Sequence, residues 1–300
     1  MTTGLLVMAY GTAAGVDDVE RYYTDIRGGR TPAPELVADL KRRYAAIGNT
    51  FPLDQITREQ AAGLEAELGP DFKAYVGYKH SPPFVADAVA SMAEEGIREA
   101  AGIVMAPHYS GMSIGGYIDR VEKVRPSRMR VDVIQSWADH PAFVEVVGDR
   151  VSAARQELSE QERANDLVIF SAHSLPSRIV DKGDPYPEEL RATADAVAAR
   201  LGLERYRTAW QSAGRTPEPW LGPPLEEVVA KAAAEGHTAV ISCPCGFTAD
   251  HLEVLYDVDI EARAAATEAG IPLVRTRTPN ADPEFIRAVA TVVRDHLKES

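Results

Sequence analysis

Two stretches of the sequence carry residues that could handle protons or a divalent metal ion. The first, LVIFSAHSLP at 167–176, is an apolar run that ends in His173 and is followed by a proline. Such a run is typical of a strand buried on both faces, and a histidine at its carboxyl end lies where open α/β sheets bind ligands. The second, DHLEVLYD at 250–257, begins a series of acids spaced by three and four residues. This spacing predicts one helix face that carries Asp250, Glu253, Asp257 and Glu261.

Each stretch also has a plainer interpretation. A histidine at the end of a strand is more often a hydrogen-bonded structural residue than a ligand. A series of acids is more often the solvated face of a helix, but here apolar residues fill most other positions between Phe247 and Tyr256. Carboxylates among so many apolar residues are less expected to be only solvated. The residues alone therefore leave both interpretations open, a solvated helix face and a functional site.

The composition excludes several classes of partner. The 300 residues suffice for two modest domains or one large α/β domain, and 45% hydrophobic residues can fill a core. A net charge of −13 argues against nucleic acid or an anionic membrane as the main partner. No signal-peptide pattern and no apolar run of membrane-spanning length is found. Because Cys243 and Cys245 are the only cysteines and are poorly spaced for a disulfide, we expect a cytoplasmic protein.

Buried-strand patterns alternate with helical patterns twice along the chain. The predicted strands begin at Gly4, Phe72, Gly102 and Val131, and again at Leu167, Tyr206, Ala239 and Leu273. We therefore predict an α/β protein of two similar Rossmann-like halves, each a four-stranded parallel sheet flanked by helices, which face one another across a cleft. The halves are placed at 1–145 and 146–300, and the last helix, 283–298, is a candidate to pack back on the first half.

Basic and aromatic residues suggest the kind of ligand that the cleft could hold. The basic residues are Arg27, Arg30, Arg43 and Lys79, and the aromatic ones are Tyr10, Tyr22, Tyr23, Tyr44 and Tyr117. Individually the basic side chains are better explained as surface charges. Together with the tyrosines they suit a flat aromatic ligand that bears carboxylates.

The sequence resembles the ferrochelatases, enzymes that insert Fe(II) into a porphyrin. The resemblance rests on GLLVMAYGT at 4–12, RYYTDIR at 21–27, APHYS at 106–110, SAHSLP at 171–176, GDPYP at 183–187, WQS at 210–212, PWLGP at 219–223 and GFTADHLEVLYD at 246–257. It is closest to the short form of Gram-positive bacteria, which acts on coproporphyrin III. Longer relatives hold an iron–sulfur cluster on four cysteines, and Cys243 and Cys245 cannot supply that set within one chain.

The resemblance assigns the metal chemistry to the two stretches described first. It implies that His173 and Glu253 form the essential pair, with His173 as base, metal ligand or both. It further implies that Glu253 shares the metal, and that Asp257 and Glu261 form an outer station that guides it. Fe(II) is then a substrate and no organic cofactor is needed. Carboxylates with one imidazole suit Fe(II) without excluding zinc, cobalt or copper.

The same resemblance assigns the porphyrin to the first half. Tyr10 matches a tyrosine that approaches the metal of the bound product from the opposite face. The remaining residues implied to contact or border the macrocycle are Arg27, Arg43, Tyr44, Tyr117, Lys79 and His80. Two residues depart from the family pattern: Gly28 replaces a second arginine, and Phe51 replaces a serine that contacts the substrate.

From the sequence we therefore expect a monomeric, cytoplasmic enzyme that converts coproporphyrin III and Fe(II) to coproheme in bacterial haem synthesis. A downstream coproheme-handling enzyme is a candidate partner, whereas nucleic acid and stable membrane insertion are not expected. The alternatives are a protoporphyrin IX ferrochelatase or a cobaltochelatase on the same fold, and a non-catalytic haem or porphyrin carrier. A carrier would need Tyr10 and the cleft but not His173, Glu253 and the outer acids.

Overall fold

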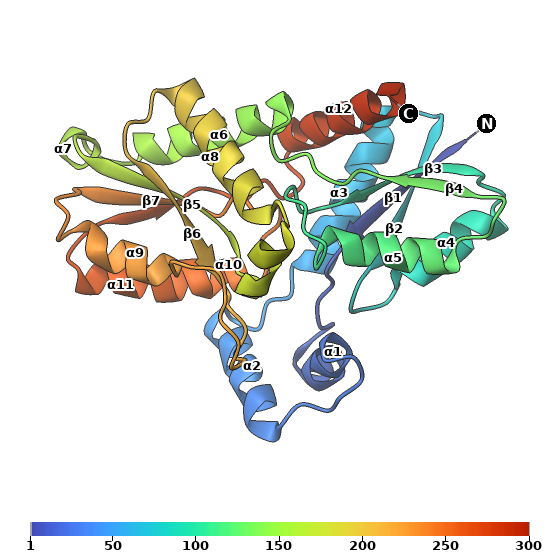
Figure 1. Ribbon diagram of the computed structural model, residues 1–300, viewed down its shortest axis with the longest axis horizontal. Coiled ribbons are helices and arrows are strands. Elements are labelled where there is room, and N and C mark those ends of the chain that lie inside the picture. The colour runs from blue at the N-terminus through green and yellow to red at the C-terminus, as the bar shows by residue number, and fades with distance from the viewer. Residues whose placement is uncertain (1, 300) are drawn as a thin grey trace.

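The computed structural model describes residues 2–299 and contains two parallel four-stranded sheets (Figure 1). The first sheet has the order β2-β1-β3-β4 and consists of β1 (Thr3–Ala9), β2 (Phe72–Tyr78), β3 (Glu99–Val104) and β4 (Arg130–Val133). The second has the order β6-β5-β7-β8 and consists of β5 (Asp166–His173), β6 (Tyr206–Gln211), β7 (Ala239–Cys243) and β8 (Leu273–Arg275). The predicted α/β fold with two similar halves is confirmed.

Helices cover both faces of each sheet, which explains the continuous apolar runs of the strands. In the first half, α4 (Val85–Glu94) and α5 (Ile114–Val124) pack on one face, and α3 (Leu53–Leu68) and α12 (Pro283–Glu299) cover the other. In the second half, α9 (Leu225–Ala232) and α11 (Arg263–Glu268) cover one face, while α6 (Pro141–Gln156) and α8 (Tyr186–Leu201) cover the other. Within residues 2–299, no helix combines the length and apolar character that a membrane span requires.

The last helix connects the halves. Although α12 follows the second sheet in sequence, it packs against α3, where a Cβ on Gly63 would lie 3.1 Å from Cγ1 of Ile286. Arg294 of α12 also pairs with Glu67 at 3.6 Å. One apolar core therefore runs from β1 through α12 to β5. The boundary predicted between residues 145 and 146 falls inside α6. The segment that connects β4 to α6 is 134–140.

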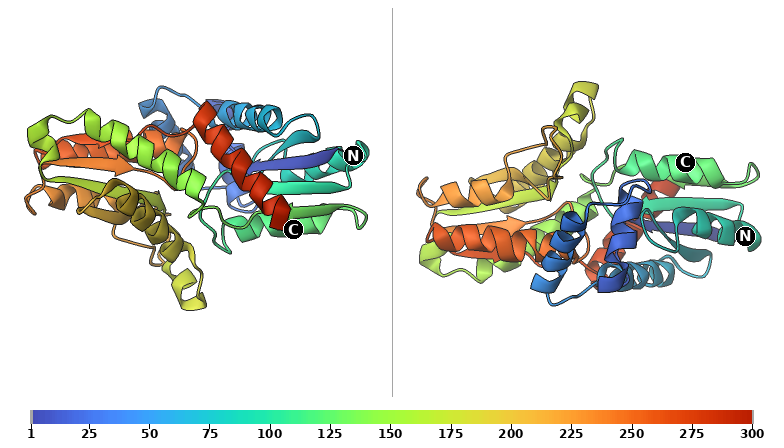
Figure 2. Two further views of the ribbon diagram at one scale, coloured as in Figure 1. Left: turned by 90° about the horizontal axis from the view of Figure 1, so that it is seen from above. Right: turned by 90° about the horizontal axis from the view of Figure 1, so that it is seen from below.

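Two helices extend away from the sheets beneath the junction of the halves (Figures 1 and 2). They are α1 (Val19–Ile26), preceded by a 3₁₀ turn at Val16–Asp18, and α2 (Pro34–Ala46). They form a small core of their own, against which Leu252 of the second half packs. Arg215, on the loop after β6, pairs with Asp39 of α2 at 2.6 Å. The extension thus belongs to the first half in sequence but contacts both.

The acidic stretch is not the single regular helix that its spacing predicts. α10 comprises only Leu252–Leu255, and Asp257–Ala262 form π-helical turns before α11 begins. Asp250 lies ahead of α10, and its carboxylate accepts hydrogen bonds from Asn280 at 2.8 Å and from Thr278. Asp250 is therefore a structural residue, and the prediction that all four acids share one helix face is wrong. The remaining short helices are α7 (Glu160–Arg163) and a 3₁₀ turn at Ser177–Lys182.

Candidate active site

His173 and Glu253 meet at the carboxyl end of the second sheet. His173 is the last residue of β5, and Glu253 lies in the first turn of α10, which follows β7. Nε2 of His173 lies 3.5 Å from Oε1 of Glu253, and each side chain remains about one-third exposed. Two groups that are 80 residues apart in sequence therefore form a solvent-accessible acid–base pair, at the edge where parallel α/β sheets bind ligands.

Neighbouring polar groups fix the orientation of this pair. His173 Nδ1 donates to the carbonyl oxygen of Ser174, which leaves Nε2 directed toward Glu253. Gln211, at the end of β6, donates to the Glu253 carbonyl at 3.0 Å and accepts from Ser171 at 2.9 Å. These bonds link the ends of β5 and β6 to α10, so the pair is held by buried structure on both sides.

Electrostatics keeps the pair ionised at neutral pH. Partial burial disfavours the imidazolium of His173, but the negative charges of Glu253 and, less strongly, Asp257 overcome this and raise its pKa to about 9. Burial likewise disfavours the Glu253 carboxylate, but His173 and His251 together hold its pKa well below the ordinary value. At neutral pH the site therefore contains an imidazolium beside a carboxylate.

Asp257 lies one turn beyond Glu253, at the start of the π-helical segment, and is buried. Ser212 donates a hydrogen bond to Oδ2, and Nη1 of Arg43 lies 3.5 Å from Oδ1. Burial raises the pKa of Asp257 to about 7, and Glu253 adds to this while Ser212 and Arg43 oppose it. Asp257 is thus a carboxyl group that gains or loses its proton near neutral pH.

The four predicted metal ligands are not gathered into one preformed site. Glu261 is exposed, and its charge contributes to the raised pKa of Asp257. Within residues 2–299, no three histidine, cysteine or acidic side chains are close enough together to hold a metal ion. The acids instead form a sequence of positions from the surface at Glu261, through Asp257, to the His173–Glu253 pair.

Tyr10 follows β1 as His173 ends β5, so the two occupy equivalent positions in the two sheets. Its ring contacts His80 with centroids 4.6 Å apart, and His80 Nδ1 bonds to Asp25 at 2.7 Å. Although Tyr10 exposes 42% of its surface, desolvation raises its pKa, and the charge of Glu253 in the other half raises it further. The surface around Tyr10 and the surface around His173 and Glu253, called here the two walls, are therefore close enough to interact electrostatically.

Lys79 and Tyr117 form a second contact on the first half. The Lys79 ammonium lies 5.0 Å from the centre of the Tyr117 ring and donates to the Met112 carbonyl at 3.3 Å. Desolvation, with a smaller contribution from Arg120, lowers the pKa of Lys79 to about 8. Lys79 thus still carries a positive charge at neutral pH, although burial disfavours that charge.

The extension supplies the remaining predicted porphyrin residues. Tyr44 of α2 stacks on Phe51 with ring centroids 4.2 Å apart, so the phenylalanine that replaces a serine makes an apolar contact there. Arg43 lies over the ring of Tyr256, 4.9 Å from its centre. Arg27 lies 6.0 Å from the Tyr23 ring, and its buried Nε makes no hydrogen bond among the described residues.

Gly28 and Gly29 follow α1 with φ values of 65° and 86°. This left-handed conformation suits glycine and would strain an arginine. At Gly28 the departure from the family pattern therefore has a local backbone reason.

Two functional candidates escaped the sequence analysis. His251 Nε2 lies 3.4 Å from Oε2 of Glu253, and its place in the sequence between Asp250 and Leu252 does not indicate this contact. Ser212, whose hydroxyl bonds Asp257, has a φ of 62° and follows the strand that ends in Gln211. Both residues lie in motifs that resemble the ferrochelatases, WQS at 210–212 and GFTADHLEVLYD at 246–257, but only their contacts in the structure show what they bind.

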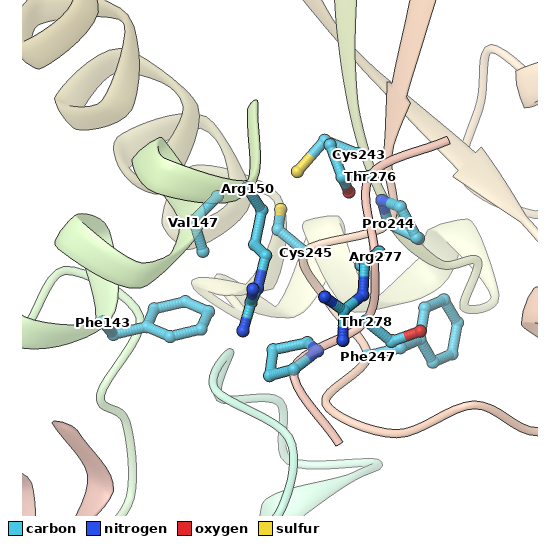
Figure 3. A pocket seen from close by; sticks show the side chains of 11 residues that line it. Phe143, Val147, Arg150, Cys243, Pro244, Cys245, Phe247, Thr276, Arg277 and Thr278 are labelled. Carbon is cyan, nitrogen blue, oxygen red and sulfur yellow. The ribbon is translucent and has the colours of Figure 1, made fainter. Parts of the chain in front are cut away.

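Cys243 and Cys245 lie elsewhere. Both are buried, and they line a small pocket drawn in Figure 3, together with Arg150 and Phe247. The pocket lies between α6 and the ends of β7 and β8, and neither His173 nor Glu253 lines it. The cysteines are therefore separate from the His173–Glu253 pair.

The sequence is similar to those of known proteins over nearly its whole length. Residues 2–297 match the family model described as ferrochelatase. The chain belongs to the ferrochelatase family. It is 46% identical over 304 residues to a coproporphyrin III ferrochelatase of Halalkalibacterium halodurans, covering 99% of this chain and 97% of the relative. It is 47% identical over 302 residues to a coproporphyrin III ferrochelatase of Bacillus subtilis, covering 98% and 97%.

Solved structures share the fold of this ferrochelatase family member at low sequence identity. SirB from Bacillus subtilis, solved with Fe³⁺, aligns with a TM-score of 0.63 at 11% identity, covering 98% of this chain and 95% of SirB. CbiX, described as the terminal enzyme of sirohaem synthesis in denitrifying bacteria, aligns with a TM-score of 0.56 at 13% identity, covering 97% and 98%. At these identities the likeness establishes the fold alone.

Proposed function

We propose that this ferrochelatase family member inserts Fe(II) into coproporphyrin III, giving coproheme in bacterial haem synthesis. The observation that carries the proposal is the His173–Glu253 pair, held 3.5 Å apart, in a chain 46–47% identical to coproporphyrin III ferrochelatases over nearly its whole length. A porphyrin between the two walls would present its nitrogens to the pair on one face and to Tyr10 on the other.

The reaction exchanges two protons for one metal ion. Two pyrrole N–H bonds break, four Fe–N contacts form, and two protons leave the macrocycle. His173, with a pKa of about 9, must lose its own proton before it can accept one. A cation arriving beside Glu253 would replace the imidazolium as its positive partner and lower the pKa of His173, so that Nε2 releases its proton to solvent and can then accept one from a pyrrole N–H. Metal arrival and base formation are thus the same electrostatic event.

The acids beyond the pair would deliver the metal. Asp257 lies between the exposed Glu261 and the His173–Glu253 pair, and its pKa of about 7 makes it a carboxylate in about half of the molecules at neutral pH. Hard oxygen ligands of this kind exchange hydrated divalent cations readily, which suits a transfer position rather than a storage site.

The first half would bind the macrocycle. Coproporphyrin III carries four propionates, and the available cations are Lys79 over Tyr117, Arg43 over Tyr256 and Arg27 beside Tyr23. The Tyr44–Phe51 stack adds an apolar surface for the ring. We further propose that the protein acts as a cytoplasmic monomer, and that a downstream enzyme takes up the coproheme.

An anaerobic metallation assay tests this function. Purified protein is given Fe(II) with coproporphyrin III and, in parallel, with protoporphyrin IX. We expect turnover with clear preference for coproporphyrin III in kcat/KM. Preference for protoporphyrin IX would leave the proposed roles of His173 and Glu253 unchanged but would make the protein a protoporphyrin IX ferrochelatase. No turnover with either would favour cobalt insertion into a corrinoid precursor, or a carrier.

A further inference from the structure

Arg43 is shared between the two substrate regions. It lies on α2, in the extension of the first half, and its Nη1 is 3.5 Å from Oδ1 of Asp257 in the second half. Its guanidinium also stacks over Tyr256, and its Nε lies 3.7 Å from Asp39. The side chain is one-quarter exposed, so a ligand can reach it from solvent.

Only one of the two oxygens of the Asp257 carboxylate that Arg43 faces accepts a hydrogen bond from the described residues. Oδ2 accepts a hydrogen bond from Ser212, whereas the buried Oδ1 makes no hydrogen bond among the described residues. Arg43 is therefore the neighbouring positive charge for an oxygen that is otherwise available. At 3.5 Å the pairing lacks the two short parallel hydrogen bonds that an arginine makes with a well-placed carboxylate.

We propose that Arg43 couples porphyrin binding to metal binding by exchanging partners. A porphyrin propionate draws Arg43 away from Asp257, and the freed Oδ1 then accepts the divalent cation. The inference rests on the proposed function, in which Arg43 contacts the porphyrin and Asp257 carries the metal, and adds that one residue links the two events.

Competition of like charges explains the coupling. The guanidinium and the metal ion compete for the Asp257 carboxylate, and the propionate and Asp257 compete for the guanidinium. A free propionate can adopt the bidentate geometry that the fixed Asp257 does not offer, so it should win Arg43. By reciprocity, each substrate must then raise the affinity for the other by the same factor, typically about 5- to 150-fold for coupled sites.

The test measures Mn²⁺ affinity by titration calorimetry, with and without nickel(II) coproporphyrin. The nickel fills the macrocycle, so the added Mn²⁺ cannot enter the ring, while all four propionates remain; the same titration of the nickel porphyrin without protein gives the Mn²⁺ that its propionates bind. We expect Mn²⁺ to bind the wild-type protein at least about 5-fold more tightly when the porphyrin is present. In Arg43→Gln, Mn²⁺ should bind equally well in both conditions, at the tighter level.

Arg42→Gln provides a matched control. Arg42 precedes Arg43 on α2, is exposed, and pairs with Asp39 of the same helix, so the variant removes the same charge without touching Asp257. It should keep the full coupling. Arg43→Lys keeps the charge but loses the planar guanidinium, so it should show a smaller coupling than the wild type. It also keeps the test valid if Arg43→Gln does not fold.

The outcomes separate the coupling from the proposed function. A wild-type enzyme that metallates coproporphyrin but binds Mn²⁺ equally with and without the nickel porphyrin would overturn the coupling alone. Coupling that survives in Arg43→Gln, or is lost equally in Arg42→Gln, would also overturn it. A protein that metallates neither porphyrin would overturn the proposed function and the coupling with it.

Discussion

The two halves share one sheet order but place opposite chemistry at the same edge. Where the first half has Tyr10 and nearby cations, the second has His173 and a series of acids. The histidines show the difference best. Desolvation lowers the pKa of His80 and outweighs the attraction of Asp25, with Lys79 adding to the decrease. At His173, Glu253, with smaller contributions from the Ser174 carbonyl and Asp257, outweighs desolvation and raises the pKa to about 9.

This comparison shows that an ion-pair partner alone does not determine the protonation state of a histidine. His80 lies only 2.7 Å from Asp25, closer than the 3.5 Å between His173 and Glu253. What differs is the remaining surroundings: Lys79 lowers the pKa of His80, whereas the hydrogen bond to the Ser174 carbonyl and the charge of Asp257 raise the pKa of His173. The fold therefore provides a neutral imidazole at His80, beside Tyr10, and a charged one at His173, beside Glu253.

The largest expected effect is the loss of chemistry on one wall only. His173→Ala should lower kcat for metallation by about 100-fold or more, because it removes the proton acceptor. Porphyrin affinity, measured by quenching of Tyr and Trp fluorescence, should stay within about 3-fold of the wild type, since the basic residues are untouched. His80→Ala should do the reverse, weakening porphyrin binding more than kcat. If His173→Ala instead weakened porphyrin binding at unchanged kcat, the division between the walls would be wrong.

A smaller effect should appear in the histidine titrations themselves. Glu253→Gln should lower the pKa of His173 from about 9 by more than one unit, because desolvation is then opposed only by the weaker effects of the Ser174 carbonyl and Asp257. Asp25→Asn should lower the pKa of His80 further below its ordinary value. NMR titration of the imidazole protons measures both. An unchanged pKa of His173 in Glu253→Gln would show that Glu253 is not its main partner.

The smallest expected effect is on stability. The pKa of Asp257 is raised from 3.8 to about 7, so the folded protein favours the neutral acid. The associated stability is complete below pH 3.8 and is lost as the pH rises through 7. Asp257→Asn should therefore raise the melting temperature relative to wild type more at pH 8 than at pH 5. An equal change in melting temperature at pH 5 and pH 8 would show that Asp257 does not contribute to the pH dependence of stability.

Much of this molecule could be predicted from the sequence. Alternating apolar runs and helical patterns gave the eight strands and their division into two sheets, because strands buried on both faces leave an unmistakable pattern. The His173 stretch was found for the same reason. The π-helical turns at Asp257–Ala262 were not, because residue spacing cannot distinguish i→i+4 from i→i+5 hydrogen bonding.

Other parts required the three-dimensional contacts. Asp250 and Glu253 look alike in sequence, yet Asp250 bonds to Asn280, a partner brought close only by the β8–α12 turn. His251 faces Glu253 because α10 begins immediately after it. The pairing of Arg43 with Asp257 joins residues from opposite halves and leaves no local pattern.

The position of α12 bears on how the protein is made. Its apolar side completes the covering of the first sheet alongside α3, yet it is translated after both sheets. While the chain is on the ribosome, the β1–β4 sheet must therefore expose part of its apolar face until the final helix emerges. The first half is in this sense the last to mature, and a nascent chain stalled before Pro283 would be prone to aggregate through its earliest residues.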